Sequence, residues 1–179
     1  NQGTIEDLVL IDVNEEKALG EAMDLNHGLA FAPRKMSIKA GSYQDCKNAD
    51  LVVITAGVSQ KPDETRIDLL NRNALIIESV TKNIMSSGFD GILLVASNPV
   101  DILTYIAQKA SGLPTSKVLG SGTSLDTARL RYEISNYIHI DARNIHAYIM
   151  GEHGDTEFVC WSKAYVGAKP MLDVIESMK

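Results

Sequence analysis

The sequence predicts an α/β fold built on a doubly wound parallel sheet. Short apolar runs alternate along the chain with longer segments in which apolar residues recur at helical spacing. The short runs are apolar throughout, which is typical of strands that helices cover on both faces. The expected strands cover residues 8–11, 51–57, 91–96 and 118–120.

Four helices are expected between and after these strands, over residues 15–26, 68–87, 101–111 and 124–136. The first places Ala18, Ala22 and Leu25 at helical spacing, and Pro99 stands close to the start of the third. The alternation becomes less regular after residues 120–122. We therefore expect one domain over residues 1–120 and the start of an α+β second domain over residues 121–179.

Composition and charge exclude several classes of protein. The formal net charge of −6 argues against a nucleic-acid or anionic-membrane partner, because both require a cationic face. The apolar runs are too short to span a bilayer. Neither Cys46 nor Cys160 belongs to a Cys-x-x-Cys pair, so we expect no disulfide framework, no metal site and a reducing, cytoplasmic setting.

Asp12 closes the first expected strand, at the edge where open parallel sheets bind ligands. An acid at this point hydrogen-bonds the adenosine ribose of a dinucleotide, and the neighbouring Val13, with no arginine nearby, favours NAD over NADP. Alternatively, Asp12 only ends the strand or caps the next helix.

The phosphate-binding glycine turn of such a fold lies about 20 residues before this acid. Only 11 residues precede Asp12, and Gly3 is the single glycine among them. Either this chain lacks the first strand and glycine turn of a Rossmann-type domain, or the Rossmann interpretation is wrong; the motifs further along the chain favour the first. The chain also has no initiator methionine and no closing motif, so we expect it to be cut short at both ends.

Two segments carry candidate catalytic residues. Residues 151–155 place His153 between two glycines, which allows a sharp turn and leaves the imidazole open to a bound molecule. Asp126 and Arg129 are three residues apart and share one face of a helix, whereas Arg131 points elsewhere. Alternatively, His153 is a turn histidine without function, and Asp126 and Arg129 form only a surface ion pair.

Two further polar segments follow expected strands. The polar loop over residues 59–66 is expected to be exposed and mobile, and it could carry Arg66 over a site. Asn98 closes another strand at the same edge, where it could face a cofactor, although an asparagine before proline is also an ordinary turn.

In their order and spacing, these segments resemble the L-lactate dehydrogenase branch of the lactate/malate dehydrogenase family, over essentially the whole chain. The resemblance implies an oxidoreductase of glycolysis and fermentation that interconverts lactate and pyruvate with NAD. His153 would give or take the substrate proton, Asp126 would fix its tautomer, and Arg129 would hold the substrate carboxylate through a bidentate pair.

The resemblance assigns the remaining site residues as well. Arg66 would polarise the reacting carbonyl when its loop closes, and Asn98 would contact the substrate oxygen and the nicotinamide ribose. Asp12 and Gly57 would bind the cofactor. The malate enzymes of the family have an arginine where this chain has Gln60, which cannot compensate a second carboxylate, so we expect a small monocarboxylic 2-hydroxy acid as the substrate.

Arg131 and His146 match the pair by which bacterial enzymes of this branch bind fructose 1,6-bisphosphate across a subunit interface. The resemblance therefore implies an allosteric homotetramer. The chain also departs from the family pattern: Asp63 replaces a usual glycine in the mobile loop, and Val159, Cys160 and Lys163 stand at variable-looking positions.

Three other interpretations remain open. The first is a malate dehydrogenase of the same fold, which Gln60 disfavours. The second is an NAD-dependent glycosidase, which would require a metal held by cysteine and histidine. The third is a non-catalytic remnant that binds a partner or has a structural role. The chain as given would then catalyse no reaction.

Overall fold

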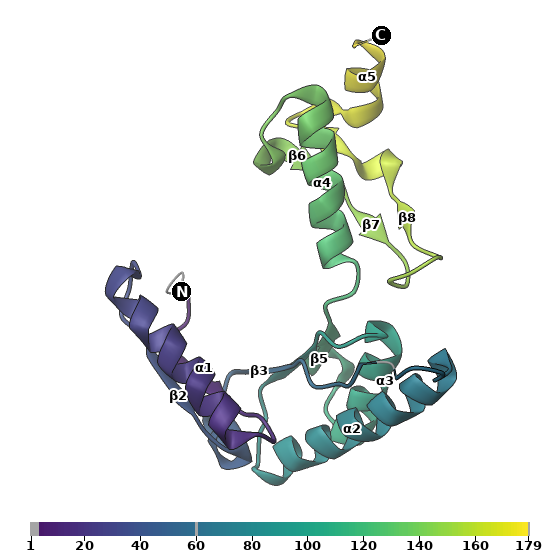
Figure 1. The fold of residues 1–179 in the computed structure, drawn as a ribbon. Coiled ribbons are helices and arrows are strands. Elements are labelled where there is room, and N and C mark those ends of the chain that lie inside the picture. The colour runs from purple at the N-terminus through teal and green to yellow at the C-terminus, as the bar shows by residue number, and fades with distance from the viewer. Residues whose placement is uncertain (1–3, 60, 179) are drawn as a thin grey trace.

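The first part of the chain forms a small parallel sheet with one helix. In the computed structural model, which describes residues 4–59 and 61–178, β1 (Asp7–Leu10) pairs in parallel with β2 (Ser37–Ala40). The helix α1 (Glu15–His27) connects them, and its N-cap Asn14 accepts a hydrogen bond from the backbone N–H of Lys17. Figure 1 shows this unit as the purple and blue arm beside the rest of the molecule.

A second parallel sheet contains β3 (Leu51–Ile54), β4 (Ile92–Val95) and β5 (Val118–Gly120), in that order. The helices α2 (Arg66–Ser86) and α3 (Val100–Ser111) connect these strands and pack against each other. The buried core under this sheet is aliphatic and aromatic, and its wholly buried members include Ile77, Leu93, Val95, Leu103 and Ala107.

The other face of this second sheet is open in the described part of the chain. The register places Val53 opposite Leu94, and Leu94 opposite Leu119, so these residues share one face. Val53 and Leu119 are each 47% exposed. The doubly wound parallel arrangement expected from the sequence is present as two parallel sheets, β1–β2 and β3–β5, and within the described residues no helix covers the face of the second sheet that carries Val53 and Leu119.

The expected strands and helices are confirmed, with small shifts at their ends. The helix expected from residue 68 begins two residues earlier, at Arg66, because Thr65 caps it. Thr65 Oγ1 accepts from the Asp68 N–H at 3.1 Å, and the Asp68 carboxylate accepts in return from the Thr65 N–H. β2 was not expected, because the strands were predicted from continuous apolar runs, whereas its four residues alternate between polar and apolar.

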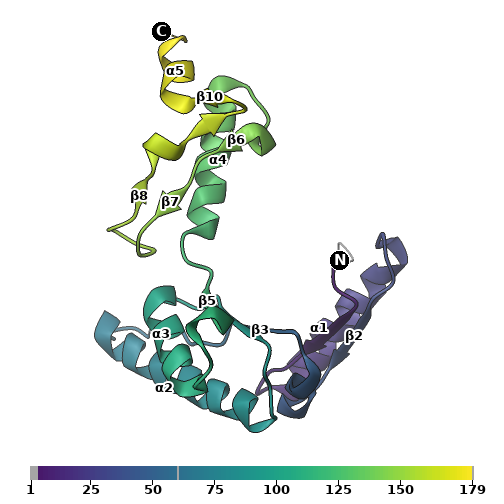
Figure 2. The same ribbon diagram turned by 180° about the vertical axis from the view of Figure 1, so that it is seen from behind.

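The C-terminal unit consists of α4 and a set of very short strands. The helix α4 (Ser124–Ile138) is followed by two antiparallel groups, β10-β9-β6 and β7-β8. Their bounds are β6 (Ile145–His146), β7 (Ile149–Met150), β8 (Phe158–Val159), β9 (Tyr165–Val166) and β10 (Lys169–Pro170), and α5 (Met171–Glu176) closes the unit. Figure 2 shows β7 and β8 running along α4, and their connecting turn lies at the end nearest α3.

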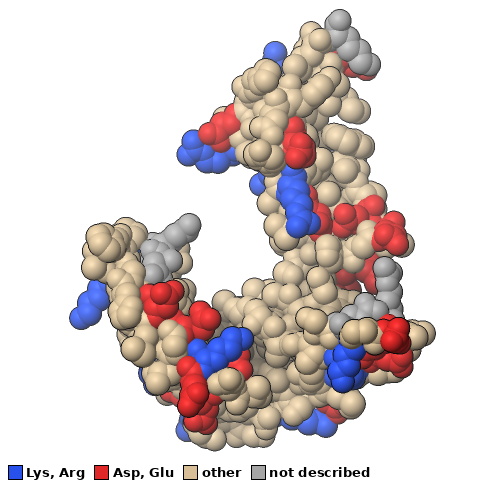
Figure 3. Space-filling view, in the orientation of Figure 1, with Lys and Arg blue, Asp and Glu red and all other residues tan. Residues whose placement is uncertain are grey.

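Among the described residues, none of the helices combines the length and the apolar character that crossing a membrane requires. The space-filling view shows an open hollow between the arm of α1 and the C-terminal unit (Figure 3).

Candidate active site

His153 lies in the turn between β7 and β8, with one glycine two residues before it and another directly after it. Gly151 has φ of 103° and Gly154 has φ of 148°, both in the left-handed region that side chains disfavour. A Cβ atom added at Gly151 would also lie 3.2 Å from the carbonyl oxygen of Thr156. The two glycines thus form the sharp turn that presents the imidazole.

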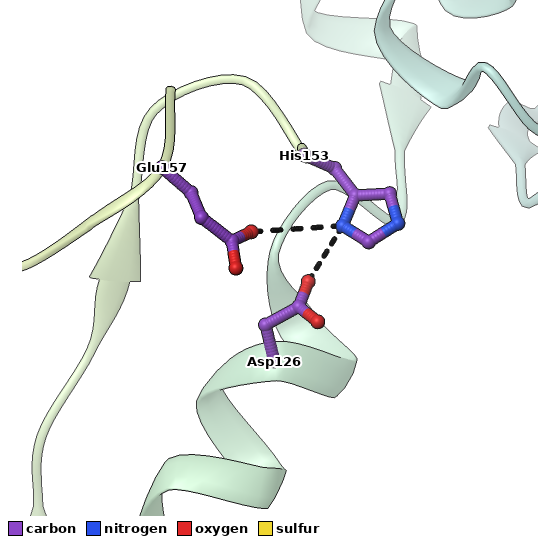
Figure 4. Close-up of side chains that lie close together, drawn as sticks. All are labelled: Asp126, His153 and Glu157. Carbon is purple, nitrogen blue, oxygen red and sulfur yellow. Dashed lines mark hydrogen bonds and ion pairs between the residues drawn. The ribbon is translucent and has the colours of Figure 1, made fainter. Parts of the chain in front are cut away.

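Asp126 binds this imidazole from the first turn of α4. Its Oδ2 atom lies 2.7 Å from His153 Nδ1, and Figure 4 shows the two side chains pointing toward each other. The Asp126 side chain is 9% exposed and that of His153 is 31% exposed. The carboxylate is therefore buried behind the ring, and Nε2 lies on the edge of the imidazole that points away from Asp126 (Figure 4).

A second carboxylate holds the backbone of the turn. The His153 backbone N–H donates to Asp101 Oδ2 at 2.9 Å, and Asp101 lies in the first turn of α3. This contact ties the turn that carries His153 to a helix beside the second sheet. Sequence reasoning missed Asp101, because an acid in the first turn of a helix is ordinarily explained by the helix dipole.

The two arginines of α4 have different surroundings. Arg129 Nη1 donates to Asp126 Oδ1 at 3.2 Å, and its side chain is 66% exposed. The Asp126–Arg129 ion pair considered as an alternative is therefore present, but most of the Arg129 side chain faces solvent beside Asp126. Arg131 Nε instead donates to the Ala147 carbonyl at 3.1 Å, and its guanidinium lies 4.8 Å from the centre of the Tyr148 ring.

The expected cofactor residues follow the carboxyl ends of β1, β3 and β4. Asp12 Oδ1 accepts from the Asn14 N–H at 2.9 Å, so the carboxylate also stabilises the start of α1. This hydrogen bond, helped by Lys17 nearby, holds the pKa of Asp12 below its usual value. The side chain is therefore an ionised hydrogen-bond acceptor at neutral pH.

Gly57 and Asn98 stand at the shared edge of the second sheet. Ser97 Oγ donates to the Ala56 carbonyl at 2.6 Å, which joins the ends of β4 and β3, and the Asn98–Pro99 peptide is cis. Asn73 Oδ1 accepts from the Val58 N–H at 2.8 Å and fixes the backbone just after Gly57.

The loop before α2 is described in part. Gln60 and the side chain of Arg66 lie outside the described residues, although the Arg66 backbone begins α2. Asp63 has φ of 65°, the left-handed conformation that favours glycine. The backbone here therefore has the conformation that suits the usual family glycine, even though this chain has aspartate.

Glu157 completes a cluster around the imidazole. The ligand atoms of Asp126, His153 and Glu157 lie within 4.8 Å of one another, which is close enough for a metal ion. His153 Nδ1, however, is already hydrogen-bonded to Asp126. This is the only such cluster that the described residues form, and it contains neither cysteine, contrary to what the glycosidase alternative requires.

Comparison with known families decides the assignment. Residues 1–120 match the lactate/malate dehydrogenase NAD binding domain, and residues 123–179 match the alpha/beta C-terminal domain of the same family. The chain belongs to the lactate/malate dehydrogenase family. The fold of this family thus accounts for both the parallel strands and the C-terminal unit that carries His153.

Similar members of the lactate/malate dehydrogenase family are L-lactate dehydrogenases. The chain is 62% identical over 167 residues to the L-lactate dehydrogenase of Priestia megaterium, covering 93% of this chain and 52% of that protein. It is 55% identical over 177 residues to the enzyme of Geobacillus stearothermophilus, covering 99% and 56%. The chain thus spans about half the length of the curated relatives it matches.

Solved structures agree with this placement. A lactate dehydrogenase from a Medee basin deep-sea metagenome library, MGS-M5, matches 100% of this chain and 57% of its own, with 76% identity and a TM-score of 0.97. The ligand-bound minor L-lactate dehydrogenase of Enterococcus mundtii matches 99% of this chain and 57% of its own, with 53% identity and a TM-score of 0.95.

Proposed function

We propose that the complete protein carrying this chain interconverts L-lactate and pyruvate by hydride transfer with NAD. The observation that carries the proposal is the His153–Asp126 pair, whose Nδ1–Oδ2 distance is 2.7 Å. The imidazole is 31% exposed, so a bound hydroxy acid can reach its Nε2 atom. A histidine held in this way suits proton exchange with an alcohol near neutral pH.

In lactate oxidation, His153 Nε2 accepts the hydroxyl proton while a hydride leaves C2 of the substrate. When bound, NAD supplies the hydride acceptor, its nicotinamide ring. Asp126 stabilises the imidazolium ion that forms, because its carboxylate accepts the Nδ1–H bond and carries the opposite charge. In pyruvate reduction, the same proton moves from Nε2 to the carbonyl oxygen.

The other site residues bind and orient the reactants. Arg129 binds the substrate carboxylate, a role that its largely exposed guanidinium on the Asp126 face of α4 supports. Arg66 polarises the carbonyl, and Asn98 contacts the substrate oxygen and the nicotinamide ribose. Asp12 binds the adenosine ribose, while Gly57 lets the cofactor approach the backbone after β3.

Gln60 selects a monocarboxylic substrate. A second substrate carboxylate would meet a neutral amide at this position, and burying that charge unpaired costs several kcal/mol. A malate dehydrogenase requires a cation at the same point. Gln60 therefore favours lactate over malate as the substrate of the complete protein.

Side-by-side assays of pyruvate and oxaloacetate reduction by the complete protein test this proposal. We expect kcat/KM for pyruvate to exceed that for oxaloacetate by about 100-fold or more, because each factor of ten corresponds to about 1.4 kcal/mol of the unpaired charge. The variant Gln60→Arg should shift the preference toward oxaloacetate. A wild-type preference for oxaloacetate would identify a malate dehydrogenase, and no NAD-dependent turnover of either acid would favour the non-catalytic alternative.

We also propose that the protein is a homotetramer that binds fructose 1,6-bisphosphate at Arg131 and His146. His146 is exposed on β6, and Arg131 donates to the carbonyl of the next residue, Ala147, so the two residues lie close together in the C-terminal unit. Two such pairs related by symmetry would repel each other without a phosphate and be neutralised by a bisphosphate.

The effector proposal predicts that fructose 1,6-bisphosphate lowers the KM for pyruvate of the complete protein. A coupling of 1–3 kcal/mol, the usual range, gives an effect of about 5- to 150-fold. In Arg131→Gln the ratio of the KM without the bisphosphate to the KM with it should fall to about 1, because one phosphate ligand is lost. Arg143→Gln is the matched control, since Arg143 is exposed and paired with Asp141 instead. Equal activation of Arg131→Gln and wild type would contradict the proposal.

A further inference from the structure

Glu157 places a second carboxylate beside the catalytic imidazole. It lies just before β8, four residues after His153, and its Oε2 atom is 3.7 Å from His153 Nδ1. Figure 4 shows Glu157 and Asp126 approaching the same ring nitrogen from different elements. Neither spacing nor residue type singles out Glu157 in the sequence, because the pairing depends on the turn between β7 and β8.

The surroundings of this carboxylate leave it dependent on His153. Glu157 Oε2 is buried and has no hydrogen-bond partner among the described residues. A buried acceptor without a partner is unfavourable, and more so when it is charged. Asp126 already accepts the Nδ1–H bond at 2.7 Å, so Glu157 acts on the ring through its charge. A protonated His153 offsets that charge, whereas a neutral one does not.

The other charges near His153 are arranged differently. From α3, Asp101 binds the backbone N–H of His153. From α4, Arg129 binds the Asp126 oxygen that faces away from the ring, at 3.2 Å, so it offsets part of the Asp126 charge. Acidic side chains gather at the end of the C-terminal unit near this turn (Figure 3). Glu157 therefore places a negative charge beside the ring, and none of the described lysines and arginines forms an ion pair with it.

We infer that Glu157 is a positioning residue whose carboxylate stabilises the imidazolium form of His153 and thereby favours binding of the keto acid over the hydroxy acid. This inference rests on the proposed function. Pyruvate must meet an imidazolium ion that donates the Nε2 proton to the carbonyl oxygen, whereas lactate must meet a neutral imidazole that accepts the hydroxyl proton. A charge that stabilises the imidazolium therefore strengthens the binding of pyruvate and weakens the binding of lactate.

The variant Glu157→Gln in the complete protein tests this assignment through both KM values. Near pH 7, where imidazole groups titrate, we expect the KM for pyruvate to rise and the KM for lactate to fall, each by about 3- to 10-fold. A merely structural role would raise both values. Glu152→Gln, which removes an exposed carboxylate of the same turn, is the matched control and should change neither KM value.

A conservative variant and a chemical probe keep the inference testable if Glu157→Gln is damaged. Glu157→Asp retains the charge, so its ratio of the two KM values should lie between those of wild type and Glu157→Gln. Diethylpyrocarbonate reacts with neutral imidazole, so it should modify His153 faster in Glu157→Gln than in wild type, without any substrate. Parallel changes of both KM values, or an unchanged modification rate, would overturn the inference. Loss of all lactate oxidation in wild type would instead overturn the proposed function.

Discussion

Replacing His153 by asparagine in the complete protein is expected to lower kcat for lactate oxidation by about 10²- to 10⁴-fold, the usual contribution of a general acid or base. Asparagine retains a polar side chain in the turn but cannot accept the hydroxyl proton at neutral pH. The rate of NADH formation, followed by its absorbance, measures the effect.

Binding of NADH provides the control for His153→Asn. The residues proposed to hold the cofactor, Asp12 and Asn98, follow β1 and β4, whereas His153 lies between β7 and β8. NADH affinity should therefore stay close to that of wild type. A variant that still oxidises lactate at the wild-type rate would exclude His153 as the proton acceptor.

Replacing Asp126 by asparagine should lower kcat/KM for pyruvate by roughly 100-fold, within the range for groups that act through proton transfer. The Asp126 side chain is 9% exposed and lies 2.7 Å from His153 Nδ1, so the amide would replace a buried charge at close range. An amide can orient the ring, but it does not stabilise the imidazolium ion and can select the wrong tautomer. Parallel kinetics in both directions check this, with a larger loss expected for pyruvate than for lactate.

Glu133→Gln is the matched control for Asp126→Asn. It removes an exposed carboxylate from the same helix, α4, without touching the β7–β8 turn. We expect its kinetics to remain within about twofold of wild type, because surface charge changes are usually small in effect. A comparable loss in both variants would mean that helix charge, rather than the contact with His153, determines activity.

The long elements of the fold were predictable because their apolar residues repeat over many positions. The helix expected over residues 124–136 extends two residues further in the structure, and the strand over residues 118–120 was correctly bounded. The short strands of the C-terminal unit were not found. Each has two residues, such as Ile149–Met150, which is too short for any periodicity to appear.

The separation of the two parallel sheets could not be read from the strands themselves. Apolar runs such as residues 51–54 indicate burial on both faces, yet Leu51 is 48% exposed. Local sequence shows that a strand can be covered, but it does not show which element covers it. The pairing of β3 with β4 joins segments that are far apart in the chain, so local sequence does not reveal it either.

The candidate site was predictable only in part for a related reason. Glycines on both sides of His153 and the acid on a helix face indicate the pair through residue type and spacing. Asp101 lies 52 residues before its partner His153, and it binds the backbone rather than the side chain. Glu157 is four residues after His153 but belongs to a turn, where helical spacing has no meaning. Both contacts depend on how the turn packs.

A double-mutant cycle with His153→Asn and Asp126→Asn in the complete protein tests most directly whether the carboxylate works through the imidazole. When two groups act as one unit, removing either of them already removes most of their joint effect. Adding Asp126→Asn to His153→Asn should therefore lower kcat/KM for pyruvate by less than about threefold. A further loss of about 100-fold, equal to that of Asp126→Asn alone, would mean that the two residues act independently and would contradict the proposed proton transfer.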